Sequence, residues 1–379
     1  MDFPMFHLDW LNNRMLIAGI ATLHVIINHG LAVGFIPLVT WLEQKGLKRS
    51  GTNQITDLEW DEKVYKMMKV AFIITTTIGA MTGVGIWFSA SLISPSSIGS
   101  LIRVFYWAWF TEWIVFVTEV VLIMIYFLSW KKSNSSLKAK IRHIRFGWFL
   151  AIASWITMTI IVAILGFMMD PGNWNSNPNL INGFTNPLYI PQLAFRTPMA
   201  MLMAGVFGLL LATIFTKYRT QIRKDAVKSI SKWIILWTPF TLFGAVWYYK
   251  AIPEGMTADM STAVGTMDFA QYYGLLKYFI IGGVSLSVVI AVIGLFKAKI
   301  IRPYMVVLPV VFAFAFLGFF ERVREFVRKP YVIGQYMYSN LLLEEDMVVY
   351  QQDGILKHAT YTSVNEVTDD NKLEAGKNV

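Results

Sequence analysis

Residues 145–168, RFGWFLAIASWITMTIIVAILGFM, decide the fold class, because their only charged residue is Arg145 at the first position. A helix of roughly 20 mostly apolar residues is long enough to cross the ~30 Å hydrocarbon core of a bilayer. Seven further runs of this kind occur. Together the runs cover 13–42, 65–90, 104–130, 145–168, 191–216, 232–250, 274–297 and 303–325. The sequence therefore predicts an all-α protein, a polytopic transmembrane bundle of about eight spans.

Composition supports the same fold class. Of the 379 residues, 55% are hydrophobic and 15% are charged, and the mean hydropathy is +0.51. Soluble domains carry about 25% charged residues, so a soluble globular enzyme is excluded. The chain has no cysteine. This absence excludes disulfides, thiolate zinc sites, iron–sulfur clusters and covalently attached haem c on this chain.

The net charge of +9 comes from connections between the apolar runs. Lys and Arg gather after the first, third, fifth and seventh runs, whereas 169–190 has neither and 251–273 has neither. Basic connections face the cytoplasm, so both termini are expected outside. This pattern predicts a multi-pass protein of the bacterial inner membrane, surrounded by lipid and not bound to nucleic acid. Residues 1–349 form the predicted transmembrane domain, and 350–379 form a polar, flexible tail.

Few ionisable residues fall inside the apolar runs, and such residues usually face the protein interior because charge in lipid is costly. At ~1.5 Å per residue, His24 lies ~16 Å, Glu112 ~12 Å and Arg196 ~8 Å from the outer end of its helix. Glu321 and Glu325 fall at the outer end of the last run. Groups on four helices thus have similar depths, which predicts one polar site that opens outward.

The spacing of these residues limits what they can do. Glu112 and Glu119 are seven apart, so they project within ~20° of each other and could pass protons along one helix face. His24 and His29 are five apart, ~140° around an α-helix, so they cannot bind one metal from the same face. Each has a structural alternative: a histidine can be a packing residue, and Arg196 can extend to the interface. His143 falls between runs and is expected in solvent.

Residues 325–334 carry a resemblance to a known family. The stretch EFVRKPYVIG, 325–334, resembles the signature of subunit I of cytochrome bd oxidases. In that family a glutamate is followed by a spacer, Gly-Arg-Gln-Pro-Trp, a short apolar pair and Gly. Glu325, Arg328 and Pro330 match, whereas the Gly, Gln and Trp are replaced. The first run, with His24, and the two-glutamate run at 104–130 also resemble the family, over about residues 12–340.

The resemblance implies roles for named residues. His24 and Glu325 would be axial ligands of two high-spin haems, haem b, haem d or one of each, and so the metal ligands of the site. Arg328 would pair with haem propionates, and Arg196 is a further candidate for cofactor binding. Glu112 and Glu119 would be catalytic, beside the haem or on its proton path, although the family separates its two glutamates by eight residues.

Three departures from the family change the expected electron path. The fifth-helix histidine of the family, a ligand of the low-spin haem b, aligns near Phe195-Arg196-Thr197, and its methionine partner aligns near Phe279. The ligands of the low-spin haem are therefore expected to be absent. The outer quinol loop would be 251–273, which is short, and no ninth apolar run follows residue 334.

Together these features predict a membrane redox subunit that takes part in respiratory electron transfer or reduces oxygen or a nitrogen oxide. Electrons would come from a c-type cytochrome on the outer face, and a second membrane subunit of cytochrome bd-like type would be the partner. Two alternatives stay open: a haem-free membrane anchor of a respiratory complex, and a proton or ion transporter that uses the buried carboxylates.

Overall fold

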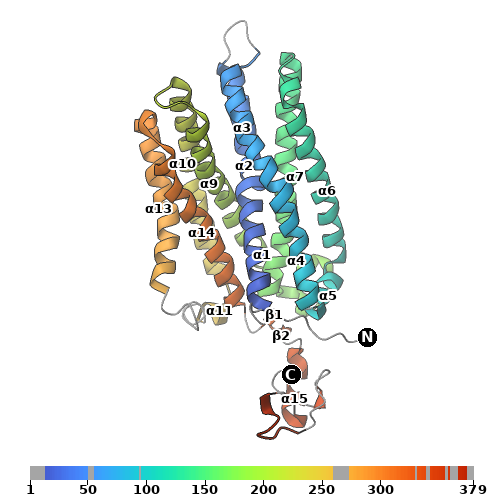
Figure 1. The fold of residues 1–379 in the computed structure, drawn as a ribbon. Helices are drawn as coiled ribbons and strands as arrows, with labels where there is room; N and C mark the ends of the chain where they lie inside the picture. The colour runs from blue at the N-terminus through green and yellow to red at the C-terminus, as the bar shows by residue number, and fades with distance from the viewer. Residues whose placement is uncertain are drawn as a thin grey trace.

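Long helices that run nearly side by side make up most of the computed structural model (Figure 1). The structure describes residues 13–49, 55–93, 95–258, 273–328, 331–338, 342–354, 357–358 and 366–373. Within these residues, eight helices are long and apolar enough to cross a membrane. They span Leu16–Arg49, Leu58–Ile93, Tyr106–Ser133, Leu137–Met169, Tyr189–Phe215, Gln221–Ala251, Ile281–Ile300 and Pro303–Glu325. The eight predicted spans are confirmed.

The first two spans are each interrupted by a π-helical segment. The first consists of α1 (Asn13–Ile27), η1 (Asn28–Val33) and α2 (Phe35–Arg49). The second consists of α3 (Leu58–Ile74), η2 (Thr75–Gly79) and α4 (Ala80–Ile93). π-helical segments inside α-helices are rare and occur frequently at functional sites. Both segments therefore mark positions where a functional site is expected.

The remaining spans are single helices. They are α6 (Tyr106–Ser133), α7 (Leu137–Met169), α9 (Tyr189–Phe215), α10 (Gln221–Ala251), α13 (Tyr273–Lys297) and α14 (Pro303–Val327). Helices α7 and α10 begin eight and eleven residues before the predicted runs, at Leu137 and Gln221. The added turns are rich in Lys and Arg, which favour helix and can reach water from a helix end.

Helix starts on the basic side are capped by polar side chains. Asp57, Ser136 and Thr220 each accept a hydrogen bond from the backbone N–H three residues later, at 3.1, 3.2 and 3.3 Å. Such caps satisfy backbone donors that have no partner within the helix. The basic connections that precede α7, α10 and α14 lie at the same end of the bundle, at the top of Figure 1. Helix α1 begins and α14 ends at the opposite end.

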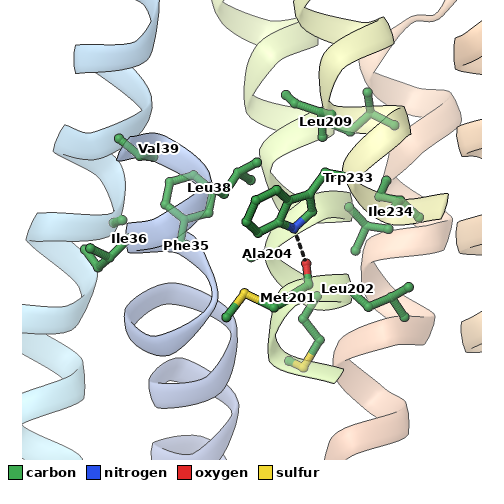
Figure 2. Packing of buried hydrophobic residues seen from close by; sticks show 14 of the residues in the cluster. Phe35, Ile36, Leu38, Val39, Met201, Leu202, Ala204, Leu209, Trp233 and Ile234 are labelled. Carbon is green, nitrogen blue, oxygen red and sulfur yellow. Dashed lines mark hydrogen bonds between the residues drawn. The ribbon is translucent and has the colours of Figure 1, made fainter. Parts of the chain in front are cut away.

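Helix α9 lies at the centre and packs against α2, α3, α7, α10 and α14. Figure 2 shows Phe35 and Leu38 of α2 facing Ala204 and Leu209 of α9, with Trp233 of α10 beside them. The Trp233 indole N–H donates to the carbonyl oxygen of Met201 at 2.9 Å. Since lipid is as apolar as these side chains, close packing and hydrogen bonds hold such helices together.

Gly34, between η1 and α2, gives the tightest test of this packing. A Cβ built on Gly34 would lie 2.1 Å from the carbonyl oxygen of Ala200 in α9. We expect Gly34→Ala to force these helices apart and to destabilise the protein by about 1–3 kcal/mol. Gly19→Ala is the matched control, because nothing lies within 4 Å of its Cβ position. Thermal unfolding in detergent measures both, and equal midpoints would contradict the close approach.

Short elements occupy the other end of the bundle. Helix α5 (Pro95–Val104) precedes α6, and the connection between α7 and α9 contains η3 (Gly172–Asn175) and α8 (Leu180–Phe184). Helix α11 (Glu254–Ala258) begins the 251–273 loop, of which 259–272 lie outside the described residues.

The chain after α14 forms a small hairpin and a helix. Strands β1 (Tyr331–Ile333) and β2 (Met337–Tyr338) pair antiparallel, and the N–H of Gly334 donates to the carbonyl oxygen of Met168 at 3.1 Å. The hairpin thus packs against the end of α7. After η6 (Glu344–Asp346), helix α15 (Met347–Asp353) crosses the boundary predicted at 349/350.

Candidate functional site

One cavity brings together four of the predicted site residues. It has a volume of about 860 Å³, counting the space at its open mouth. Its lining includes His24 of α1, Glu112 and Glu119 of α6, and Arg196 of α9. Residues of η1, η2 and α7 complete the lining, so both π-helical segments contribute to it. Glu325 and Arg328 are not among its lining residues.

Of the two histidines that line the cavity, His24 has a ring nitrogen that can bind a ligand. Its Nδ1 lies 3.2 Å from the carbonyl oxygen of Gly79 and 3.2 Å from the hydroxyl of Thr82. A carbonyl oxygen only accepts, so Nδ1 carries the proton and Nε2 presents a lone pair. Metal-binding histidines usually have this arrangement, with the other ring nitrogen held by a backbone carbonyl. A Cβ on Gly83 would lie 3.0 Å from the His24 ring, so the glycine leaves room for it.

His29 also lines the cavity, but both of its ring nitrogens are engaged. Nδ1 lies 3.0 Å from the carbonyl oxygen of Val25, and Nε2 lies 3.3 Å from Nη1 of Arg196. A carbonyl accepts and a guanidinium donates, so the two partners fix the tautomer of the ring. The sequence-based conclusion that the two histidines cannot share one metal agrees with these contacts.

The two carboxylates on α6 have different surroundings. Glu119 is buried, and it accepts hydrogen bonds from the hydroxyls of Ser154 at 2.5 Å and Thr157 at 3.2 Å. Glu112 is only partly buried and forms no hydrogen bond or ion pair with any residue that the structure describes. One carboxylate is therefore held in place by α7, while the other has no partner among the described residues.

Arg196 is fully buried and joins the cavity to α14. Its Nη1 lies 2.5 Å from Oε1 of Glu321, and Glu321 also accepts from Nε of Arg324 at 3.1 Å. With its amide oxygen turned toward Arg196, Gln192 accepts from Nε and Nη2 at 3.1 Å each. Arg196 thus lies in an ion-pair network and does not extend to the interface.

Glu325 and Arg328 are paired with each other one turn apart at the end of α14. Glu325 also lies 3.5 Å from Nη2 of Arg324. Nη1 of Arg328 donates to the carbonyl oxygens of Tyr331 at 2.7 Å and Val332 at 3.1 Å. In this structure the predicted signature residues therefore fasten strand β1 to the end of the last helix.

A second buried polar cluster lies toward the basic end of the bundle and was not predicted. Lys140 of α7 lies 2.6 Å from Glu43 of α2 and 2.6 Å from Asp61 of α3. Glu43 also contacts Nδ1 of His143 at 2.7 Å and accepts from the hydroxyl of Tyr126 at 2.7 Å. Lys140 and Glu43 are both 0% exposed, so the cluster ties four helices together away from water.

The expectation that His143 lies in solvent is wrong. The residue is buried, because α7 begins well before the predicted span and carries His143 into the bundle. Its Nε2 lies 2.9 Å from the carbonyl oxygen of Tyr126 and its Nδ1 faces the Glu43 carboxylate. Both ring nitrogens are therefore engaged inside the cluster.

A three-residue spacing on α7 was the available signal for this cluster. Lys140 and His143 are three apart, so they lie on the same face of a helix. The run of Lys and Arg around them is equally typical of a solvated connection. The burial of Lys140 and His143 could therefore not be predicted. Within the described residues, no group of three or more His, Asp or Glu side chains is arranged to hold a metal ion.

Comparison with known proteins rests on structure. No protein-family model matches the sequence, and neither does any curated protein. A chain of the bd oxidase from Geobacillus thermodenitrificans is similar in structure, with a TM-score of 0.68 and 17% sequence identity. The match covers 89% of this chain and 93% of that chain. The two chains share a fold.

The shared fold agrees with the architecture that the resemblance implied. With eight described helices long and apolar enough to cross a membrane, this chain is a multi-pass membrane protein whose bundle is built like that chain of the bd oxidase. At 17% identity the likeness concerns the fold, so the roles of individual residues must be argued from this chain.

Two observations test whether these residues suit a haem. His24 has one nitrogen anchored and the other available. At the end of α14, Nη1 of Arg324 and Nε of Arg328 are buried without a hydrogen-bond partner. Guanidinium nitrogens of this kind suit carboxylates such as haem propionates. The position near 195–197 does not suit a haem ligand, because Arg196 has no lone pair and pairs with Glu321.

Proposed function

We propose that this chain is the haem-binding subunit of a bd oxidase-like complex that reduces oxygen or a nitrogen oxide in the bacterial inner membrane. The observation that carries the proposal is His24, whose anchored imidazole lines a cavity with two carboxylates. The shared fold supports it. A second membrane subunit would complete the complex.

Two high-spin haems, of type b or d, would be held by His24 and by Glu325, which would have to part from Arg328. Arg328 and Arg324 would then pair with propionates. When bound, haem would supply the redox chemistry, and the protein would supply ligation, protons and access.

The carboxylates on α6 would handle protons. Glu112, which has no partner among the described residues, would take up a proton at the cavity, and Glu119, held by Ser154 and Thr157, would pass it along the same helix face.

Electrons would enter from outside the chain. The family's low-spin haem ligand aligns near Phe195-Arg196-Thr197, where Arg196 is committed to an ion pair. We therefore propose a c-type cytochrome at the outer face as the donor. Because this chain has no cysteine, that cytochrome must be another polypeptide.

A haem assay on the purified complex tests the proposal. We expect the wild type to contain protohaem or haem d by the pyridine haemochrome method and to show a high-spin signal. His24→Ala should remove most of the signal of the haem that it ligates. His29→Gln is the matched control, because His29 lines the same cavity with both nitrogens already engaged. A wild type without haem would favour the membrane-anchor alternative, and unchanged spectra in His24→Ala would reject the assigned ligand.

A further inference from the structure

Three arginines surround one tyrosine at the basic end of the bundle. The guanidinium carbons of Arg302, Arg219 and Arg223 lie 4.5, 5.2 and 5.6 Å from the ring centroid of Tyr218. Tyr218 and Arg219 belong to the connection between α9 and α10, and Arg302 belongs to the connection between α13 and α14. These two connections lie near each other in Figure 1. We refer to Tyr218, Arg219, Arg223 and Arg302 as the arginine cluster.

Arg223 holds the two connections together. Its guanidinium donates to the carbonyl oxygens of Thr213, of Thr216 at 2.9 Å and of Ile301 at 3.4 Å, and to the hydroxyl of Thr216 at 3.2 Å. Arg223 is only 4% exposed, yet all of these acceptors are neutral. Its positive charge is therefore fixed in place and is not neutralised by them.

No carboxylate balances the cluster. Among the described residues, Arg219, Arg223 and Arg302 form no ion pair, whereas Arg49 at the same end pairs with Asp57 and Asp225. Asp225 is the acid nearest in sequence to Arg223, and it is already engaged by Arg49 at 2.6 Å. Three like charges around one ring repel each other, so the arrangement favours an anion among them.

The surroundings of the cluster suit a lipid. Ile214 and Ile300 are 52% and 43% exposed, and Phe296 and Tyr304 are 82% and 69% exposed. In the sequence, Ile214 lies five residues before Arg219, and Ile300 and Tyr304 lie two residues on either side of Arg302. By the distribution of Lys and Arg, this end faces the cytoplasm, where the leaflet carries anionic lipids. Basic pockets between helices on that side bind phosphate-bearing head groups.

We propose that the arginine cluster binds the phosphate of an anionic phospholipid at the cytoplasmic membrane surface. Arg219 and Arg302, both exposed, would contact the phosphate directly, and Arg223 would add a fixed charge beneath it. The acyl chains would lie along Phe296 and Ile214. The inference does not depend on haem, so it stands or falls separately from the proposed function.

Lipid binding to the purified complex tests it. We expect Arg219→Ala/Arg302→Ala to weaken binding of phosphatidylglycerol about tenfold, counted by native mass spectrometry after delipidation. Lys132→Ala/Lys138→Ala is the matched control, because it removes the same charge from exposed positions at the same end. The control should change binding by less than about twofold, which is within the small effect of single surface charges.

Three outcomes would overturn the proposal. The first is an equal loss in both double variants, which would mean a diffuse surface charge. The second is equal binding of phosphatidylcholine, which would mean that head-group charge is irrelevant. The third is full protection of the complex against thermal unfolding by inorganic phosphate without lipid, which would mean a site for a free anion. Arg223 is left unchanged in the test because it joins two connections of the fold.

Discussion

Replacing Lys140 by Met is expected to destabilise the protein by about 3–5 kcal/mol, the usual cost of leaving a buried charge without its partner. Lys140 is 0% exposed and lies 2.6 Å from both Glu43 and Asp61. Without it, Glu43 would keep His143 at 2.7 Å and the hydroxyl of Tyr126. Asp61 would keep only the neutral donors of Trp130 at 3.0 Å and Asn134 at 2.9 Å. The helices that meet here, α2, α3, α6 and α7, would separate first.

Thermal unfolding in detergent, followed by tryptophan fluorescence, measures this effect. Trp130 donates to Asp61 and so reports on the cluster itself. Lys138→Met is the matched control, because Lys138 is exposed on the same helix and forms no ion pair with a described residue. If Lys140→Met and Lys138→Met unfold at the same temperature, the carboxylates of Glu43 and Asp61 have access to water. That result would contradict the buried network.

The fold could be predicted from the sequence because a bilayer leaves few alternatives. A run such as 145–168 must be helical, since lipid offers no partners for backbone N–H and C=O groups. Hydropathy does not mark where a helix ends beyond the bilayer. The start of α7 at Leu137 was therefore missed, and with it the burial of Lys140 and His143. The π-helical segments also leave no mark that hydropathy can detect.

The candidate site could be predicted in part. A spacing of seven placed Glu112 and Glu119 on one face, and depth grouped Glu112 with His24 and Arg196. All four residues line the same cavity. Contacts between distant helices could not be predicted. The ion pair of Arg196 and Glu321 joins residues 125 positions apart, and nothing local in either helix specifies it.

Replacing Arg196 by Met is expected to destabilise the protein by about 3 kcal/mol, at the lower end of the range for a broken buried pair. Glu321 would lose its contact at 2.5 Å but keep Arg324 at 3.1 Å, which limits the cost. His29 and Gln192 would each lose a donor. The measurement is the midpoint of thermal unfolding of the purified complex, together with its haem content.

Arg196→Met/Glu321→Met separates a structural ion pair from a cofactor contact. Replacing both members of a buried pair by apolar groups is often neutral or stabilising, so the double variant should be more stable than Arg196→Met alone. Haem content should stay at the wild-type level in both, because His24 keeps its contact with Gly79. If haem is lost while stability is unchanged, Arg196 binds the cofactor, and its pairing with Glu321 is secondary. If stability falls and haem remains, Arg196 holds α9 to α14 through its ion pair with Glu321 and does not bind the cofactor.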